Sequence, residues 1–121
     1  MTHKILIVDD EPNIVMSIEF LLKKEGFTTD TAGDGDMALE KVRSFLPDVV
    51  LLDVMMPKKS GFEVCEILRA DATVKQPRII MLTAKGRETE QAKGLALGAD
   101  AYMLKPFSTK DLVAKIREFL A

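Results

Sequence analysis

The chain is poor in the residues and segments that mark several large classes of protein. Its 121 residues include one cysteine and one histidine. Cys65 cannot form an internal disulfide, which suits the cytoplasm, and His3 has no cysteine or histidine beside it, so we expect it to be solvated. No apolar run exceeds four residues, which leaves nothing to span a bilayer and is too short for a secretion signal.

The charge of the chain is also small. A formal net charge of −2 argues against nucleic-acid or anionic-membrane binding, so we expect neither partner. The composition, 47% apolar and 30% charged, is too apolar for a disordered chain. The length matches one domain, which we expect to cover residues 1–121.

Short apolar runs alternate with segments of helical period. The runs are rich in branched residues and predict strands at 5–8, 27–32, 49–52, 79–82 and 101–104, the second being Thr-rich and suited to a sheet edge. Helices are predicted at 12–25, 36–45, 61–70, 87–97 and 109–120. Five strand–helix repeats predict an α/β fold, with a doubly wound parallel sheet and helices on both faces.

Polar residues directly follow four of the predicted strands. Asp9-Asp10 follow 5–8, Asp53 follows 49–52, Thr83 follows 79–82 and Lys105 follows 101–104. Ligands of open α/β sheets bind at the carboxyl edge, where the winding direction reverses. Strand order 2-1-3-4-5, the flavodoxin-like order, brings these four strands to one edge.

The chemistry of this cluster points to phosphate. Carboxylates about 5 Å apart repel by ~3 kcal/mol per pair at an effective dielectric near 20. Lys105 offsets part of this repulsion, and a hard divalent cation such as Mg²⁺ would balance the rest. A carboxylate beside Mg²⁺ and a lysine can act as a nucleophile toward a phosphoryl group.

Four motifs give the chain a resemblance to a known family. They are Asp9-Asp10, Asp53-Val54-Met55-Met56-Pro57 with Gly61, Thr83-Ala84, and Lys105-Pro106-Phe107. In order and spacing these motifs resemble the response-regulator receiver domain of two-component signalling, and the resemblance covers residues 4–120. It implies a signalling phosphoacceptor in the cytoplasm, not an enzyme in the ordinary sense, although with intrinsic Mg²⁺-dependent phosphotransfer and autodephosphorylation.

The resemblance implies a role for each residue at the metal. Asp53 would be the phosphoacceptor, taking its phosphoryl group from a histidine of a sensor kinase or phosphotransfer protein. Asp10 and Asp53 would bind Mg²⁺ directly, Asp9 largely through water, and Met55 through its backbone carbonyl.

Further roles follow for the switch. Lys105, the Thr83 hydroxyl and the Ala84 amide would bind the phosphoryl group, and Tyr102 would turn inward as Thr83 moves. The fourth helix, fifth strand and fifth helix would form the output surface. This surface would act on a downstream protein or output domain, or as a homodimer contact on phosphorylation.

Three other functions remain to be weighed. A phosphohydrolase of the haloacid-dehalogenase type needs a second acid two residues after its nucleophile, where this chain has Met55. A nucleotide or flavin module needs a glycine-rich loop after the first strand, where Asp9-Asp10-Glu11-Pro12 stands. A pseudo-receiver would lack some of the five functional residues of the family. None is missing here, where they are Asp9, Asp10, Asp53, Thr83 and Lys105.

Two apolar side chains face away from the predicted core. In helix 12–25, Met16 and Phe20 project opposite the stripe of Ile14, Ile18 and Leu21. Such residues are often scattered surface apolars. We favour a docking patch for the kinase.

A stand-alone regulator that does not contact nucleic acid is the simplest expectation. A piece of a longer regulator would have the same sequence.

Overall fold

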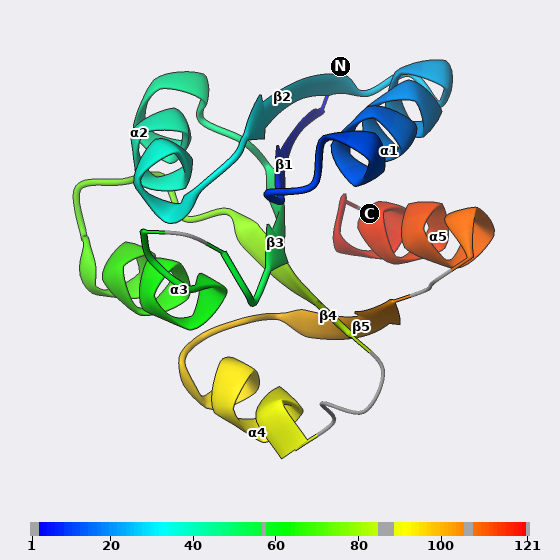
Figure 1. The fold of residues 1–121 in the computed structure, drawn as a ribbon. Helices are drawn as coiled ribbons and strands as arrows, with labels where there is room; N and C mark the ends of the chain where they lie inside the picture. The colour runs from blue at the N-terminus through cyan, green and yellow to red at the C-terminus, as the bar shows by residue number, and fades with distance from the viewer. Residues whose placement is uncertain (1–2, 57, 85–88, 106–107, 121) are drawn as a thin grey trace.

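A parallel sheet with helices on both faces forms the molecule (Figure 1). The structure, a computed structural model, describes residues 3–56, 58–84, 89–105 and 108–120. The strands are β1 (Lys4–Val8), β2 (Thr28–Ala32), β3 (Val49–Asp53), β4 (Arg78–Ala84) and β5 (Ala101–Lys105). The helices are α1 (Pro12–Lys24), α2 (Gly35–Phe45), α3 (Gly61–Ala70), α4 (Thr89–Ala96) and α5 (Thr109–Leu120).

The strand order β2-β1-β3-β4-β5, with every pairing parallel, confirms the predicted fold class. Strand β2 is at the edge, as its sequence indicated. Three strands run one residue or more past their predicted ends, so Asp53, Thr83 and Lys105 lie within the sheet. Of the motif residues, Pro57, Pro106 and Phe107 lie outside the described part of the chain, as do the first two residues of predicted helix 87–97.

Local sequence signals account for the helix ends. Asp34 caps α2 by accepting the Met37 N–H at 2.8 Å, and Ser108 caps α5 by accepting the Asp111 N–H at 3.0 Å. Helix α3 begins with a capping box, in which the Ser60 and Glu63 side chains each accept the other's backbone N–H. The chain leaves α1 through Gly26, whose φ of +92° suits glycine.

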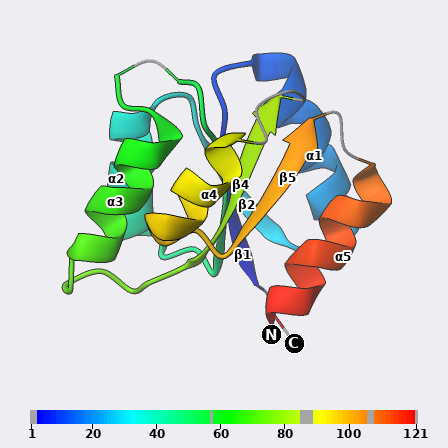
Figure 2. The ribbon, with the colours of Figure 1, turned by 90° about the horizontal axis from the view of Figure 1, so that it is seen from below.

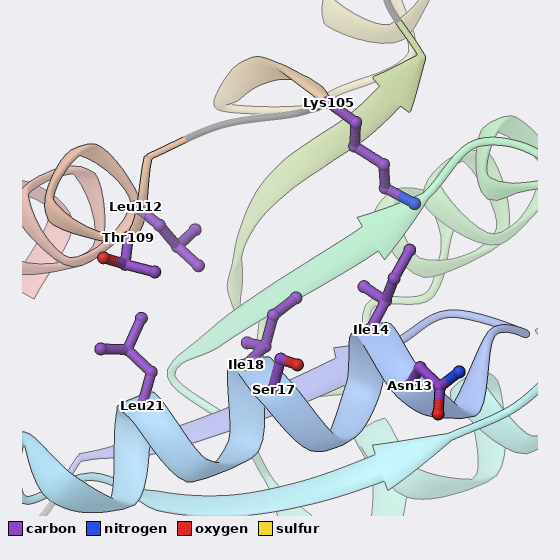
Figure 3. Close-up of a pocket in the computed structure, with 8 residues that line it drawn as sticks. All are labelled: Asn13, Ile14, Ser17, Ile18, Leu21, Lys105, Thr109 and Leu112. Carbon is purple, nitrogen blue, oxygen red and sulfur yellow. The ribbon is translucent and has the colours of Figure 1, made fainter.

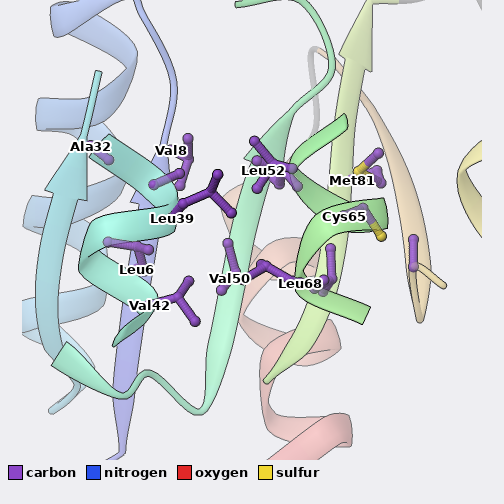
Figure 4. Packing of buried hydrophobic residues seen from close by; sticks show 14 of the residues in the cluster. Leu6, Val8, Ala32, Leu39, Val42, Val50, Leu52, Cys65, Leu68 and Met81 are labelled. Carbon is purple, nitrogen blue, oxygen red and sulfur yellow. The ribbon is translucent and has the colours of Figure 1, made fainter. Parts of the chain in front are cut away.

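Alternate residues of the central strands enter two cores, one on each face of the sheet. On one face, Leu6, Val50 and Met81 pack with α2 and α3 (Figure 4). On the other, Ile7, Leu51 and their neighbours pack with α1 and α5. Figure 2 shows α1 and α5 together on one side of the sheet and α2, α3 and α4 on the opposite side. Because both faces are covered, β3 is buried along its whole length and holds Asp53 firmly at its end.

Cys65 lies in the core between the sheet and α3, and burial raises the pKa of its thiol. Its Sγ is 3.5 Å from the Leu97 carbonyl oxygen. None of the described helices has the length and apolar character needed to cross a membrane.

Candidate functional site

Three carboxylates meet at the carboxyl edge of the sheet. Asp9 and Asp10 follow β1, Asp53 ends β3, and the two strands are adjacent. One oxygen from each carboxylate lies within 4.8 Å of the others. Asp9 and Asp53 are buried, whereas Asp10 is exposed. The structure therefore brings together the acidic residues that the sequence placed at one edge, in an arrangement that could hold a metal ion.

Lys105, at the end of β5, reaches across to this cluster. Its Nζ lies 2.7 Å from Asp9 Oδ2 and 3.5 Å from Asp53 Oδ1. Figure 3 shows the side chain extending from the end of its strand toward the tip of β3. Burial lowers the pKa of Lys105, but the hydrogen bond that its ammonium donates to Asp9 and the charges of both aspartates outweigh it, so the pKa is raised. The lysine is held charged beside the two buried carboxylates.

Asp53 has the most perturbed environment of the described carboxylates. Burial, followed by the negative charge of Asp9, raises its pKa from 3.8 to about 6. Asp10 adds to this rise, while Lys105 and a hydrogen bond from the Met55 backbone N–H oppose it. One lysine thus leaves the site with uncompensated negative charge, which is the condition that favours a bound cation.

The Met55 N–H was not among the groups that the sequence indicated. The resemblance assigned Met55 a role through its carbonyl, whereas here its amide donates to Asp53. Met55 is 56% exposed, and its contact with Asp53 is made by the backbone. A turn immediately after a strand-end aspartate is the signal that would have suggested such a bond.

Thr83 and Tyr102 lie on the neighbouring strands. Thr83 is 1% exposed, and among the described residues its Oγ1 is a buried side-chain oxygen with no hydrogen-bond partner. An unpartnered buried hydroxyl costs roughly 1–3 kcal/mol, so it is unfavourable unless a ligand oxygen or a rearrangement satisfies it. Tyr102 pairs in register with Met81, is half-buried and packs against the core under α2 and α3. Ala84 pairs with Lys105 across β4 and β5.

Two hollows near the carboxylate cluster differ in size and in the polarity of their lining. A cavity of about 510 Å³ lies between α1 and α5 and is lined by apolar side chains, including Ile14, Ile18 and Leu112, and by Lys105 (Figure 3). A smaller hollow of about 180 Å³ includes Asp9 and Asp10. The larger cavity is lined in part by Lys105 and by none of the three carboxylates.

The exposed apolar residues of α1 lie where the helical period predicted. Met16 is 66% exposed and Phe20 is 74% exposed. Ile18, on the opposite face of the helix, is buried in the core with α5.

Comparison with known proteins gives one consistent match. The family model described as the response regulator receiver domain matches residues 5–117. The DNA-binding response regulator MtrA of Mycolicibacterium smegmatis is 47% identical over 117 residues, which cover 97% of this chain and 50% of that protein. The alkaline phosphatase synthesis transcriptional regulatory protein PhoP of Bacillus subtilis is 45% identical over 120 residues, which cover 99% of this chain and 49% of that protein.

The fold also matches solved structures. The crystal structure of a response regulator from Chloroflexus aurantiacus superposes with a TM-score of 0.93 at 32% identity, covering 99% of this chain and 98% of that one. This chain spans about half the length of MtrA and of PhoP.

These relatives correct one prediction. The expectation of a regulator with no direct nucleic-acid binding is wrong, because MtrA is named a DNA-binding response regulator and PhoP a transcriptional regulatory protein. The net charge of −2 describes these 121 residues and carries no information about the other half of such regulators.

Proposed function

The chain belongs to the response regulator receiver family of two-component systems, and we propose that residues 1–121 form one receiver domain that accepts a phosphoryl group on Asp53. The donor would be a phosphohistidine of a sensor kinase or a histidine phosphotransfer protein. The observation that carries this proposal is the meeting of three carboxylate oxygens within 4.8 Å, with Lys105 contacting two of those aspartates.

The residues of this cluster fit Mg²⁺. One lysine and one divalent cation balance three carboxylates, and Mg²⁺ prefers a few carboxylate oxygens together with water and phosphate. Asp10 and Asp53 would hold the ion directly, Asp9 largely through water, and Met55 through its carbonyl. When bound, Mg²⁺ would supply positive charge to the oxygens of the phosphoryl group in transfer.

The ionisation state of Asp53 would suit it to accept a phosphoryl group. With a pKa of about 6, its carboxylate is mostly ionised at neutral pH and is the nucleophilic form. One carboxylate oxygen forms a bond to phosphorus while the bond from phosphorus to the imidazole nitrogen of the donor breaks. The electron pair stays on that nitrogen, and the product on Asp53 is an acyl phosphate. Lys105, already beside Asp53, would pair with the phosphoryl oxygens.

The switch would depend on Thr83. Its unpartnered hydroxyl is a ready donor to a phosphoryl oxygen on Asp53, and the Ala84 amide would bind the same group. Movement of Thr83 would vacate space for Tyr102 to turn inward. Phosphorylation would thereby shift an existing equilibrium at the surface formed by α4, β5 and α5.

The names of two relatives support a proposal for what that surface controls. Because MtrA and PhoP are named as DNA-binding and transcriptional regulators, we take DNA binding as the proposed output of the regulator to which this receiver belongs. A buried and unpaired Cys65 suits a reducing compartment, so we place the domain in the cytoplasm.

Labelling by acetyl phosphate tests the proposal directly. With Mg²⁺ present, the wild-type chain should gain one acid-stable, alkali-labile phosphoryl group, and Asp53→Asn should gain none. Asp111→Asn removes an exposed aspartate of α5 and should label as the wild type does. Undiminished labelling of Asp53→Asn would show that another residue is the acceptor.

A further inference from the structure

The segment between β3 and α3, described at residues 54–56 and 58–60, carries a backbone N–H that bonds to Asp53. At its start, the Val54 N–H donates to the Leu82 carbonyl at 3.0 Å, which extends the sheet by one bond. At its end, the Gly61 N–H donates to the Val54 carbonyl at 2.8 Å. Between these bonds, the Met55 N–H reaches the carboxylate of Asp53. The position of this segment therefore decides where the Met55 backbone lies relative to the phosphoacceptor.

Helix α2 contacts this segment near its end, at Lys59. A Cβ atom on Gly35, the first residue of α2, would lie 2.5 Å from Lys59 Cβ and 2.6 Å from the Lys59 carbonyl oxygen. The Lys59 ammonium also pairs with Asp36 Oδ1 at 2.8 Å. Figure 1 shows the segment passing the start of α2 on its way to α3.

Neither helix formation nor backbone conformation explains a glycine at position 35. Alanine is normally favoured over glycine within a helix, and no left-handed φ is present there. The close approach of the Lys59 backbone does explain it, since any side chain would push the segment away from α2. The ion pair is a weaker anchor, because both of its side chains are about a third or more exposed.

We propose that Gly35 is a positioning residue of the phosphoacceptor site. By leaving room for the Lys59 backbone against α2, it holds the segment so that the Met55 backbone stays on Asp53. This inference rests on the proposed function, because it assigns Gly35 a part in cation binding and phosphoryl transfer. It acts through the segment and not by touching the reacting atoms.

Gly35→Ala tests the inference, with Gly33→Ala as the matched control. A Cβ on Gly33 meets no atom within 4 Å, although the residue lies only two positions before Gly35, in the turn that leads into α2. Gly35→Ala should weaken Mg²⁺ binding measured by calorimetry about tenfold, as loss of an outer-shell support does elsewhere. Gly33→Ala should bind Mg²⁺ as the wild type does. Lys59→Met removes the charge and keeps the Cβ, so it should have little effect.

A second readout does not depend on the metal or on phosphate. Amide hydrogen exchange of Gly61 and Met55 in metal-free protein should become faster in Gly35→Ala and stay unchanged in Gly33→Ala. The double variant Gly35→Ala with Lys59→Gly removes the Cβ of Lys59 from the contact but leaves the Lys59 carbonyl oxygen 2.6 Å from the new Cβ, so it should recover part of the lost protection. A purely helical role for Gly35 would not be rescued by a change in another element.

The outcomes separate this inference from the proposed function. If the wild type neither binds Mg²⁺ nor takes up phosphate, the proposed function fails, and the exchange data still decide whether Gly35 positions the segment. Equal exchange and equal Mg²⁺ affinity in Gly35→Ala and Gly33→Ala would overturn the inference. The inference would also be overturned if both Gly35→Ala and the double variant failed to fold.

Discussion

The ammonium of Lys105 lies 2.7 Å from Asp9 Oδ2, although 96 positions of sequence separate the two residues. Asp53, the proposed acceptor, is farther from the same ammonium, at 3.5 Å. In this state the lysine compensates mainly the carboxylate of Asp9. We expect it to shift toward Asp53 when a phosphoryl group adds negative charge there.

Replacing Lys105 should separate cation binding from chemistry. Lys105→Met removes a positive charge beside the carboxylates, so Mg²⁺ should bind more tightly. Acetyl phosphate labelling should nevertheless slow by roughly 100-fold, because a charge that stabilises the transferred group is lost. Calorimetry and labelling rates measure the two effects. Lys41→Met, which breaks a partly exposed pair with Asp30 away from the site, is the control. Weaker Mg²⁺ binding in Lys105→Met would contradict the electrostatic account.

Removing the charge of Asp53 should stabilise the metal-free protein at neutral pH. Its pKa rises from 3.8 to about 6 on folding, so the native state binds the proton more tightly than the unfolded state. Stability therefore falls as pH rises through this window. In EDTA at pH 7.5, Asp53→Asn should be more stable than the wild type by ~1–3 kcal/mol, a gap that closes near pH 4.

Chemical denaturation from pH 4 to pH 8 measures that gap. Asp48→Asn is a control of opposite sign. Burial raises the pKa of Asp48, but hydrogen bonds from the Lys4 N–H and Lys75 outweigh it, so the pKa is lowered and its loss should destabilise at neutral pH. A gap for Asp53→Asn that does not change between pH 4 and pH 8 would rule out the linkage.

The Thr83 hydroxyl should destabilise the unphosphorylated protein and should be needed for the switch on phosphorylation. Thr83→Val keeps the shape and removes the unpartnered hydroxyl, so the free energy of unfolding should rise by roughly 1–2 kcal/mol. With Mg²⁺ and the phosphate mimic beryllofluoride, the Tyr102 resonances should shift in the wild type and much less in the variant. An equal shift in both proteins would remove Thr83 from the switch.

Phe20 should affect the rate of phosphotransfer from a kinase and not the rate of labelling by acetyl phosphate. Phe20→Ala should slow phosphotransfer from a cognate kinase by about tenfold, since it removes an exposed aromatic anchor on the helix that begins at the acidic edge. Labelling by acetyl phosphate should not change. Leu46→Ala truncates a 43% exposed residue at the far end of α2, so it should alter neither rate. Equal slowing with both donors would place the effect in the site instead of in docking.

Much of this protein is determined by local patterns in its sequence. Branched apolar runs and helical periods establish the elements and their order, because burying an apolar face against a sheet needs only the right spacing. Parallel strands bring their carboxyl ends to one edge, so the meeting of Asp9, Asp10 and Asp53 was predictable as well.

The tertiary structure alone decided the remaining relationships. The closer contact of Lys105 with Asp9, the raised pKa of Asp53 and the missing side chain of Gly35 opposite Lys59 all join residues distant in sequence. Each depends on a few ångströms of separation and on how much water is excluded, since Coulomb energies and packing change steeply over that range. Sequence spacing does not encode those distances, which arise from the twist and packing of the whole sheet.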